Sequence, residues 1–247
     1  MTEFTIALAG KRIQIRAIYD YARDYCKDYL AEGDADFSVT VSPADIAYEQ
    51  ERSAREDALE GLPVRQFKPE YLETLSIYRK IAEKMLSYDT LLFHGSAISV
   101  DGEGYLFTAK SGTGKSTHTR LWRQRFGERC VPVNDDKPLL RVTEDAVLVF
   151  GTPWDGKHRL STNTAVPLKG LVILERGAEN EIEPVEVSAA LPMLLQQSYR
   201  PADPVSLSRL LRLLEQMTKK TALYRLRCNM DPEAAQVAYE GMQRKDN

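Results

Sequence analysis

The chain has 247 residues, 43% of them hydrophobic, and its 33 basic and 36 acidic residues give a formal net charge of −3. This hydrophobic content excludes a disordered or fibrous chain, and the balanced charge argues against a general nucleic-acid binder. The length predicts one or two domains. The three cysteines, Cys26, Cys130 and Cys228, match no zinc-binding spacing and are typical of reduced thiols.

The N-terminus and the hydropathy predict a cytoplasmic protein that makes no use of a membrane. The first ten residues lack the basic region of a signal peptide, and Glu3 interrupts them. The best uncharged apolar run, Gly170 to Leu174, has the size of a strand and is too short to span a bilayer.

Residues 1–87 are expected to form a small α+β region. Alternating runs over Phe4 to Leu8 and Ile13 to Ala17 predict a hairpin. Three tyrosines then recur every fourth residue, which indicates a helix with a core-facing aromatic stripe. They are Tyr21, Tyr25 and Tyr29.

The remainder of this region is predicted to contain one more strand and two helices. Phe37 to Val41 has the composition of a strand, and Ser42 followed by Pro43 favours a helix start. The mixed charges of Glu49 to Gly61 indicate a solvated face or a loop. Apolar residues at helical spacing predict a helix from about Pro69 to Leu86, and we place the domain boundary near Ser87.

Residues 88–247 carry the pattern of an α/β domain. Two apolar strands, Leu91 to Val100 and Tyr105 to Ala109, are joined by a short turn, which predicts a second hairpin. A helix is expected over Thr117 to Phe126, and the apolar run Leu171 to Leu174 is typical of a central strand. Further helices are predicted near 207–217 and 232–242.

A glycine-rich segment, AKSGTGKST, occupies residues 109–117 between the strand and the helix. The P-loop pattern G-x-x-x-x-G-K-[ST] is matched at Gly114, Lys115 and Ser116, whereas Ala109 stands at its first glycine position. Lys115 would neutralise the β- and γ-phosphates, and the Ser116 hydroxyl would ligate Mg²⁺. We therefore expect this segment to bind ATP and Mg²⁺. The expected binding residues are Ser111, Gly112, Thr113, Gly114, Lys115, Ser116 and Thr117.

An acidic pair follows the next predicted strand, Val131 to Val133. Beside a P-loop, one carboxylate of Asp135 and Asp136 can hold Mg²⁺ while the other accepts the proton of an attacking hydroxyl. Because adjacent carboxylates repel each other, one of them is expected to be partly protonated without the metal. An Asx turn at Asn134 is the alternative interpretation of the same residues.

A turn-rich segment with several cations follows at residues 152–159. Lys157 or Arg159 could act as a cationic clamp on the transferring phosphoryl group, and an ordinary surface loop is the alternative. Trp154 is expected to contribute packing. The cations of the helix after the glycine-rich loop, which begin at His118, are expected to form a solvated face.

Residues 91–176 resemble the HPr kinase/phosphorylase and phosphoenolpyruvate carboxykinase group of P-loop proteins, and the whole chain is similar to bacterial HPr-kinase-related proteins. The resemblance rests on FHGSA (93–97), GYLFTAKSGTGKST (104–117), VNDDKPLLR (133–141) and GTPWDGKHRLSTNTAVPLKGLVILERG (151–177). It implies an α/β fold with a P-loop nucleotide-binding core of this type. It also implies a catalytic His94 beside Asp135 and Asp136, without assigning which aspartate is the base.

The function expected from these features is an ATP- and Mg²⁺-dependent kinase. The resemblance implies that the acceptor is a serine hydroxyl of a protein or peptide, with free serine as a further option, since some relatives phosphorylate a peptide serine in peptide-modification systems. A nucleotide-binding regulatory protein with little turnover is the alternative, and a carboxykinase-like lyase is a weaker one. Homo-oligomerisation stays open.

Overall fold

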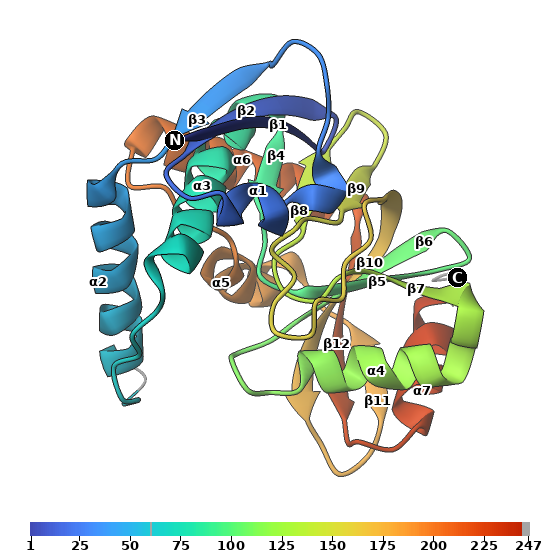
Figure 1. Ribbon diagram of the computed structural model, residues 1–247. Coiled ribbons are helices and arrows are strands. Elements are labelled where there is room, and N and C mark those ends of the chain that lie inside the picture. Colours follow the sequence, from blue (N-terminus) through green and yellow to red (C-terminus); the bar gives the residue numbers. More distant parts are fainter. Residues whose placement is uncertain (60, 244–247) are drawn as a thin grey trace. The chain divides into compact units, whose positions relative to one another are not determined.

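The structure, a computed structural model that describes residues 1–59 and 61–243, divides into two compact units, Met1–Lys84 and Met85–Asn247 (Figure 1). A three-stranded sheet belongs to the first unit and a nine-stranded sheet to the second. No helix within the described residues is long and apolar enough to cross a lipid bilayer.

The first unit pairs a small sheet with three helices. Its elements are β1 (Thr2–Leu8), β2 (Lys11–Ala17), α1 (Tyr21–Tyr25), β3 (Phe37–Thr40), α2 (Pro43–Leu59) and α3 (Pro69–Met85). The predicted hairpin is confirmed, because β1 and β2 pair antiparallel through a turn in which Ala9 and Gly10 adopt positive φ angles. β3 lies parallel to β2 on the far side from β1.

The predicted tyrosine stripe is wrong. Tyr21 is exposed, whereas Ala22, Cys26 and Tyr29 are buried. The reason is that α1 covers five residues and a 3₁₀ turn follows it, so the α-helical spacing does not extend along the three tyrosines.

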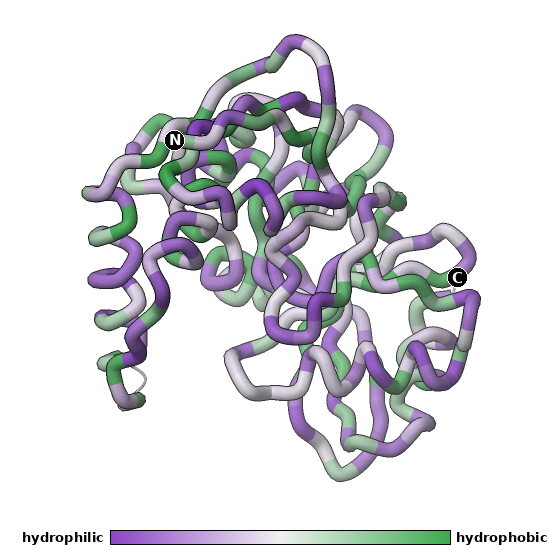
Figure 2. The backbone as a smooth tube through the Cα atoms, in the orientation of Figure 1, coloured by the Kyte–Doolittle hydropathy of each residue, from purple (hydrophilic) through white to green (hydrophobic). Residues whose placement is uncertain are grey.

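The expectation of a solvated face or loop over residues 49–61 is confirmed in part: residues 49–59 belong to α2 and are mostly exposed or half-buried, but two acids among them are buried. Residue 60 lies outside the described residues. Glu49 and Asp57 are only 2% and 1% exposed. Glu49 Oε1 accepts a hydrogen bond from Arg79 Nε at 2.6 Å, and Asp57 Oδ1 accepts one from Arg65 Nη2 at 2.6 Å. Charged pairs thus occupy positions where apolar residues would have signalled burial, and Figure 2 colours much of α2 as hydrophilic.

Arg79→Ala should destabilise the first unit by about 3–5 kcal/mol, because it leaves the buried Glu49 carboxylate without its main partner. Urea unfolding of the full chain followed by circular dichroism measures this loss. Arg55→Ala, at an exposed position of α2, is the control and should change stability by less than about 0.5 kcal/mol. Equal, small losses for both variants would contradict the importance of the buried pair.

The second unit is built around the larger sheet. Its strands are β4 (Thr90–Leu92), β5 (Ser96–Val100), β6 (Glu103–Thr108), β7 (Cys130–Asn134), β8 (Leu139–Val142), β9 (Val147–Phe150), β10 (Ala165–Arg176), β11 (Glu181–Pro184) and β12 (Ala222–Cys228). Its helices are α4 (Lys115–Phe126), α5 (Val187–Gln197), α6 (Pro204–Lys220) and α7 (Glu233–Gln243).

In the part of the sheet formed by β5, β6, β7, β10 and β12, four strands point the same way. β10 is parallel to both β6 and β12, and β5 is antiparallel to both β6 and β7, so β7 shares the direction of β6. The carboxyl ends of β7, β6, β10 and β12 therefore lie at one edge, which is where ligands bind in open α/β sheets. The central position predicted for residues 171–174 is confirmed.

The predicted strand Leu91 to Val100 is two strands, because the chain breaks between β4 and β5. β4 pairs with β8, whereas β5 pairs with β6 and β7. Gly95 lies at the break, and a Cβ there would be 2.8 Å from Leu106 Cδ1. Its backbone N–H donates to the Asp136 carbonyl at 3.0 Å, so the break brings residues 94–95 against the acidic pair.

Helices cover both faces of the sheet, as the continuous burial of β5, β6 and residues 170–174 requires. On one face, Phe107 and Val172 pack with α4 and α7, which lie side by side in Figure 1. On the other face, Leu106 and Leu171 pack with α5 and α6. The sheet is thus held between two helical layers and fixes the positions of its strand ends.

Candidate active site

The glycine-rich loop links the carboxyl end of β6 to the start of α4, in the predicted order of strand, loop and helix. Gly112 and Gly114 have φ angles of +73° and +124°, which side chains rarely tolerate. A Cβ at Gly112 would meet no heavy atom within 4 Å. The loop is therefore open on that side, and the unpaired N–H groups of the first turn of α4 begin at its end.

Lys115 lies at the start of α4 with its side chain turned back over the loop. Its Nζ donates to the Ala109 carbonyl at 3.3 Å. Burial lowers the pKa of Lys115, and the charges of Asp136 and Asp135 oppose that shift. The two carboxylates therefore lie within electrostatic reach of this ammonium group.

Asp135 is tied to the first turn of α4 by a chain of hydroxyl groups. The Ser96 hydroxyl donates to Asp135 Oδ1 at 2.5 Å, and it lies 3.1 Å from Thr119 Oγ1. Thr119 Oγ1 also lies 3.4 Å from the Ser116 carbonyl oxygen, which is the alternative acceptor for its single proton. Because Asp135 is only 9% exposed, these contacts fix its carboxylate relative to the helix that follows the glycine-rich loop.

The Asp136 carboxylate contacts two side chains, His94 and Lys137. His94 Nε2 lies 3.3 Å from Asp136 Oδ1, and Lys137 Nζ donates to Oδ2 at 2.5 Å. Burial raises the pKa of Asp136, but the His94 hydrogen bond and the Lys137 charge outweigh it, so the pKa lies below its usual range. These neighbours stabilise the charge of Asp136. The expectation that one aspartate of the pair is partly protonated stays a prediction.

Asn134 forms the Asx turn that was the alternative interpretation, and the turn positions the acidic pair. Its Oδ1 accepts from the backbone N–H groups of Asp136 and Lys137 at 2.9 and 2.7 Å. Its Nδ2 donates to the Thr152 and Trp154 carbonyls. The turn thus connects the end of β7 to the segment that contains the cationic loop.

Residues 155–159 lie against Asp136. A Cβ at Gly156 would be 3.0 Å from Asp136 Cβ. Arg159 adopts a φ of 52° and pairs with Asp155, with 3.1 Å between Nη1 and Oδ1. Lys157 is exposed, and Trp154 is 2% exposed, which confirms its packing role.

Asp155 is a third acid of this neighbourhood that the sequence analysis did not select. It is 5% exposed. Burial raises its pKa, the Arg159 charge lowers it, and the charges of Asp136 and Asp135 raise it further.

Within residues 1–59 and 61–243, no three or more His, Cys, Asp or Glu side chains form a group that could hold a metal ion. Mg²⁺ at Ser116 and one aspartate would need phosphate oxygens and water as further ligands.

Sequence reasoning also missed Ser96, Thr119, Lys137 and Arg176, and it misplaced His118. Arg176 Nη2 donates to the Gly112 carbonyl at 2.7 Å, so a cation from the end of β10 contacts the glycine-rich loop. The expectation that His118 belongs to a solvated face is wrong, because it is 3% exposed and packs on Phe107. The sequence signal for a buried role of His118 was its position directly after the glycine-rich loop, in the first turn of the helix.

A family model described as "SynChlorMet cassette protein ScmC" matches residues 63–232. The chain belongs to the ScmC family. The match extends from the second half of the first unit through the glycine-rich loop and the acidic pair to the residue before α7. No curated protein matches the chain.

Among solved structures, the chain is similar to the Hpr(Ser) kinase/phosphatase from Coxiella burnetii. The match has 11% sequence identity and a TM-score of 0.35, and it covers 60% of this chain and 94% of that one.

Proposed function

We propose that this ScmC-family protein is an ATP- and Mg²⁺-dependent phosphotransferase of the HPr-kinase type, which transfers the γ-phosphate to a serine hydroxyl of a protein or peptide. The observation that carries the proposal is the grouping of Lys115 with Asp135 and Asp136 at the carboxyl ends of β6 and β7. Phosphoryl transfer needs charge neutralisation and a base for the acceptor, and these residues offer both.

The residues present fit a nucleotide and its metal. The open backbone at Gly112 leaves room for phosphate oxygens beside the first N–H groups of α4. Ser116 and Asp135 would hold Mg²⁺, since the hydroxyl chain through Ser96 and Thr119 fixes one relative to the other. When bound, Mg²⁺ would neutralise charge on the phosphates.

Asp136 is the base in this proposal. Its side chain is more accessible than that of Asp135, and the His94 contact orients its carboxylate. The acceptor oxygen forms a bond to the γ-phosphorus, the bond from that phosphorus to the β,γ-bridging oxygen breaks, and the acceptor proton passes to Asp136. The products are ADP and a phosphoserine.

Residues 155–159 would supply the clamp on the transferring group. We expect Lys157→Ala or Arg159→Ala to lower the single-turnover rate about 10²–10³-fold with little change in ATP affinity, because such contacts form in the transition state. Rapid-quench measurements at saturating ATP and acceptor test this. Wild-type rates for both variants would show that residues 155–159 form an ordinary surface loop without a role in phosphoryl transfer.

The experiment for the function itself uses the full chain with [γ-³²P]ATP and Mg²⁺. Three acceptors are compared: a randomised peptide pool with a fixed central serine, the same pool with alanine there, and free serine. We expect label in the serine pool, recovered as phosphoserine, with a matching amount of ADP. Bound ATP without ADP formation or labelled serine would instead support a nucleotide-binding regulatory protein.

A further inference from the structure

Lys157 and Arg159 are both candidates for the clamp on the transferring phosphoryl group, but their contacts differ. Lys157 is exposed and pairs with no acid among the described residues. Arg159 Nη1 lies 3.1 Å from Asp155 Oδ1, and the same nitrogen donates to the Pro153 carbonyl at 3.3 Å. The guanidinium group of Arg159 is therefore directed back onto its own loop.

Asp155 depends on this partner because its carboxylate is buried. Its Oδ1 atom accepts no hydrogen bond within the described part of the chain, so the charge of Arg159 is what compensates it. Burial raises the pKa of Asp155, the Arg159 charge opposes that shift, and the charges of Asp136 and Asp135 add to it. A buried carboxylate that loses its cationic partner is strongly destabilised. If Arg159 turned towards a phosphoryl group, it would leave Asp155 in that state.

The backbone of the same loop supports a fixed position for Arg159. Its φ angle of 52° lies in a region that residues other than glycine rarely occupy. Its N–H donates to the Gly156 carbonyl at 3.4 Å, and a Cβ at Gly156 would be 3.0 Å from Asp136 Cβ. Because strained backbone persists only where its surroundings hold it, the contacts of Arg159 with Asp155 and Pro153 stabilise the loop beside Asp136.

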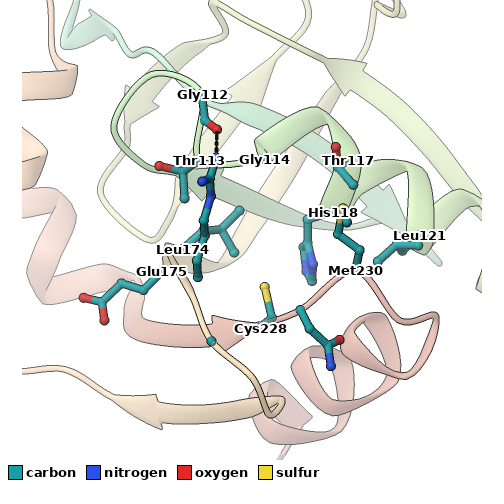
Figure 3. A pocket seen from close by; sticks show the side chains of 13 residues that line it. Gly112, Thr113, Gly114, Thr117, His118, Leu121, Leu174, Glu175, Cys228 and Met230 are labelled. Carbon is teal, nitrogen blue, oxygen red and sulfur yellow. Dashed lines mark hydrogen bonds between the residues drawn. The ribbon is translucent and has the colours of Figure 1, made fainter.

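Arg176 is a second arginine of the site that already has an oxygen partner. Its Nη2 donates to the Gly112 carbonyl at 2.7 Å, which is the hydrogen bond drawn at Gly112 in Figure 3. A guanidinium group anchored in this way reaches a new partner only at the cost of the bond it has. Arg159 would bear that cost, whereas Lys157 would not.

We propose that Arg159 is a positioning residue, which compensates the buried Asp155 carboxylate and keeps residues 155–159 folded beside Asp136, and that Lys157 is the clamp. The inference rests on the proposed function, because it requires a phosphoryl group to be transferred at this site. It gives Asp155 a role and assigns different roles to the two cations of the loop.

A double-mutant cycle separates a compensating charge from a clamp. Arg159→Gln removes the charge but keeps much of the side chain, so the unpaired Asp155 carboxylate should repel the phosphates. ATP affinity and the single-turnover rate should then both fall at least about tenfold. Adding Asp155→Asn removes the unpaired charge and should restore both to within about threefold of the wild type.

Lys157→Ala should show a different pattern. Its single-turnover rate should fall about 10²–10³-fold while its ATP affinity stays unchanged, because the clamp acts in the transition state. Adding Asp155→Asn should not restore this rate. The matched control is His158→Ala, an exposed neighbour in the same loop, which should stay within about threefold of the wild type in both measurements.

Calorimetry with ATP and Mg²⁺ and rapid-quench transfer to the serine peptide pool provide the two measurements. Losses in Arg159→Gln that Asp155→Asn does not relieve would overturn the inference, because Arg159 would then act on the phosphoryl group itself. Wild-type behaviour of Arg159→Gln or of Lys157→Ala would overturn it as well. A wild-type chain that binds no ATP or labels no serine would instead overturn the proposed function.

Thermal unfolding followed by circular dichroism covers the case in which Arg159→Gln does not fold. Recovery of a folded chain on adding Asp155→Asn would support the compensating role of Arg159, because only the unpaired carboxylate has been removed. A double variant that stays unfolded would overturn that role.

Discussion

Lys115→Ala should weaken Mg²⁺-ATP binding by at least about 100-fold. Each charge-assisted hydrogen bond contributes about 1.5–3 kcal/mol, and Lys115 is expected to make one to each of two phosphates. Its position over the loop, with Nζ 3.3 Å from the Ala109 carbonyl, places the ammonium group where those phosphates would lie. Calorimetry with ATP and Mg²⁺ measures the change.

The matched control is Lys110→Ala, which removes an exposed lysine from the same loop. Its affinity for ATP should stay within about threefold of the wild type, because an exposed charge is screened by solvent. Wild-type affinity in Lys115→Ala would refute the assignment of residues 111–117 to phosphate binding. Equal losses in both variants would indicate a general electrostatic effect.

Asp135→Asn and Asp136→Asn should impair different steps, nucleotide binding in the first variant and turnover in the second. Asp136→Asn should leave nucleotide binding intact and lower turnover about 10²–10⁴-fold, because it removes the proposed base. Asp135→Asn should weaken the Mg²⁺-dependent part of nucleotide binding, because it removes the carboxylate linked to α4 through Ser96. ATP calorimetry at several Mg²⁺ concentrations, together with ADP release, separates the two effects.

Asp145→Asn is the control for this pair, since Asp145 is an exposed acid in the turn after β8. It should behave as the wild type in both assays. Normal binding and turnover in both Asp135→Asn and Asp136→Asn would show that the acidic pair has only a structural role in the turn. Exchanged behaviour of the two variants would reverse the roles assigned here.

The parts of the fold that sequence analysis predicted are those set by local patterns. The hairpin of β1 and β2, the helix α3 and the order of β6, loop and α4 all follow from the spacing of apolar residues and from glycine positions. The errors arose where tertiary contacts replaced a local signal. Charged pairs support α2 at Glu49 and Asp57, and long-range pairing divides β4 from β5.

The candidate site was only partly accessible to sequence reasoning for the same reason. The glycine-rich loop and the acidic pair are contiguous segments, so their residue types could be read directly. The contact of Ser96 with Asp135 joins positions 39 residues apart, and the contact of Arg176 with Gly112 joins positions 64 apart. The pairing of strands that are distant in the sequence creates both contacts, and no local pattern in the sequence shows which distant strands pair.

The most direct test of the account is a crystal structure of the full chain with a non-hydrolysable ATP analogue and Mg²⁺. We expect the triphosphate on the backbone N–H groups of residues 112–117, with Lys115 Nζ about 3 Å from β- and γ-phosphate oxygens. The terminal phosphate should face Asp135 and Asp136. A nucleotide bound elsewhere, or a terminal phosphate directed away from the acidic pair, would contradict the account.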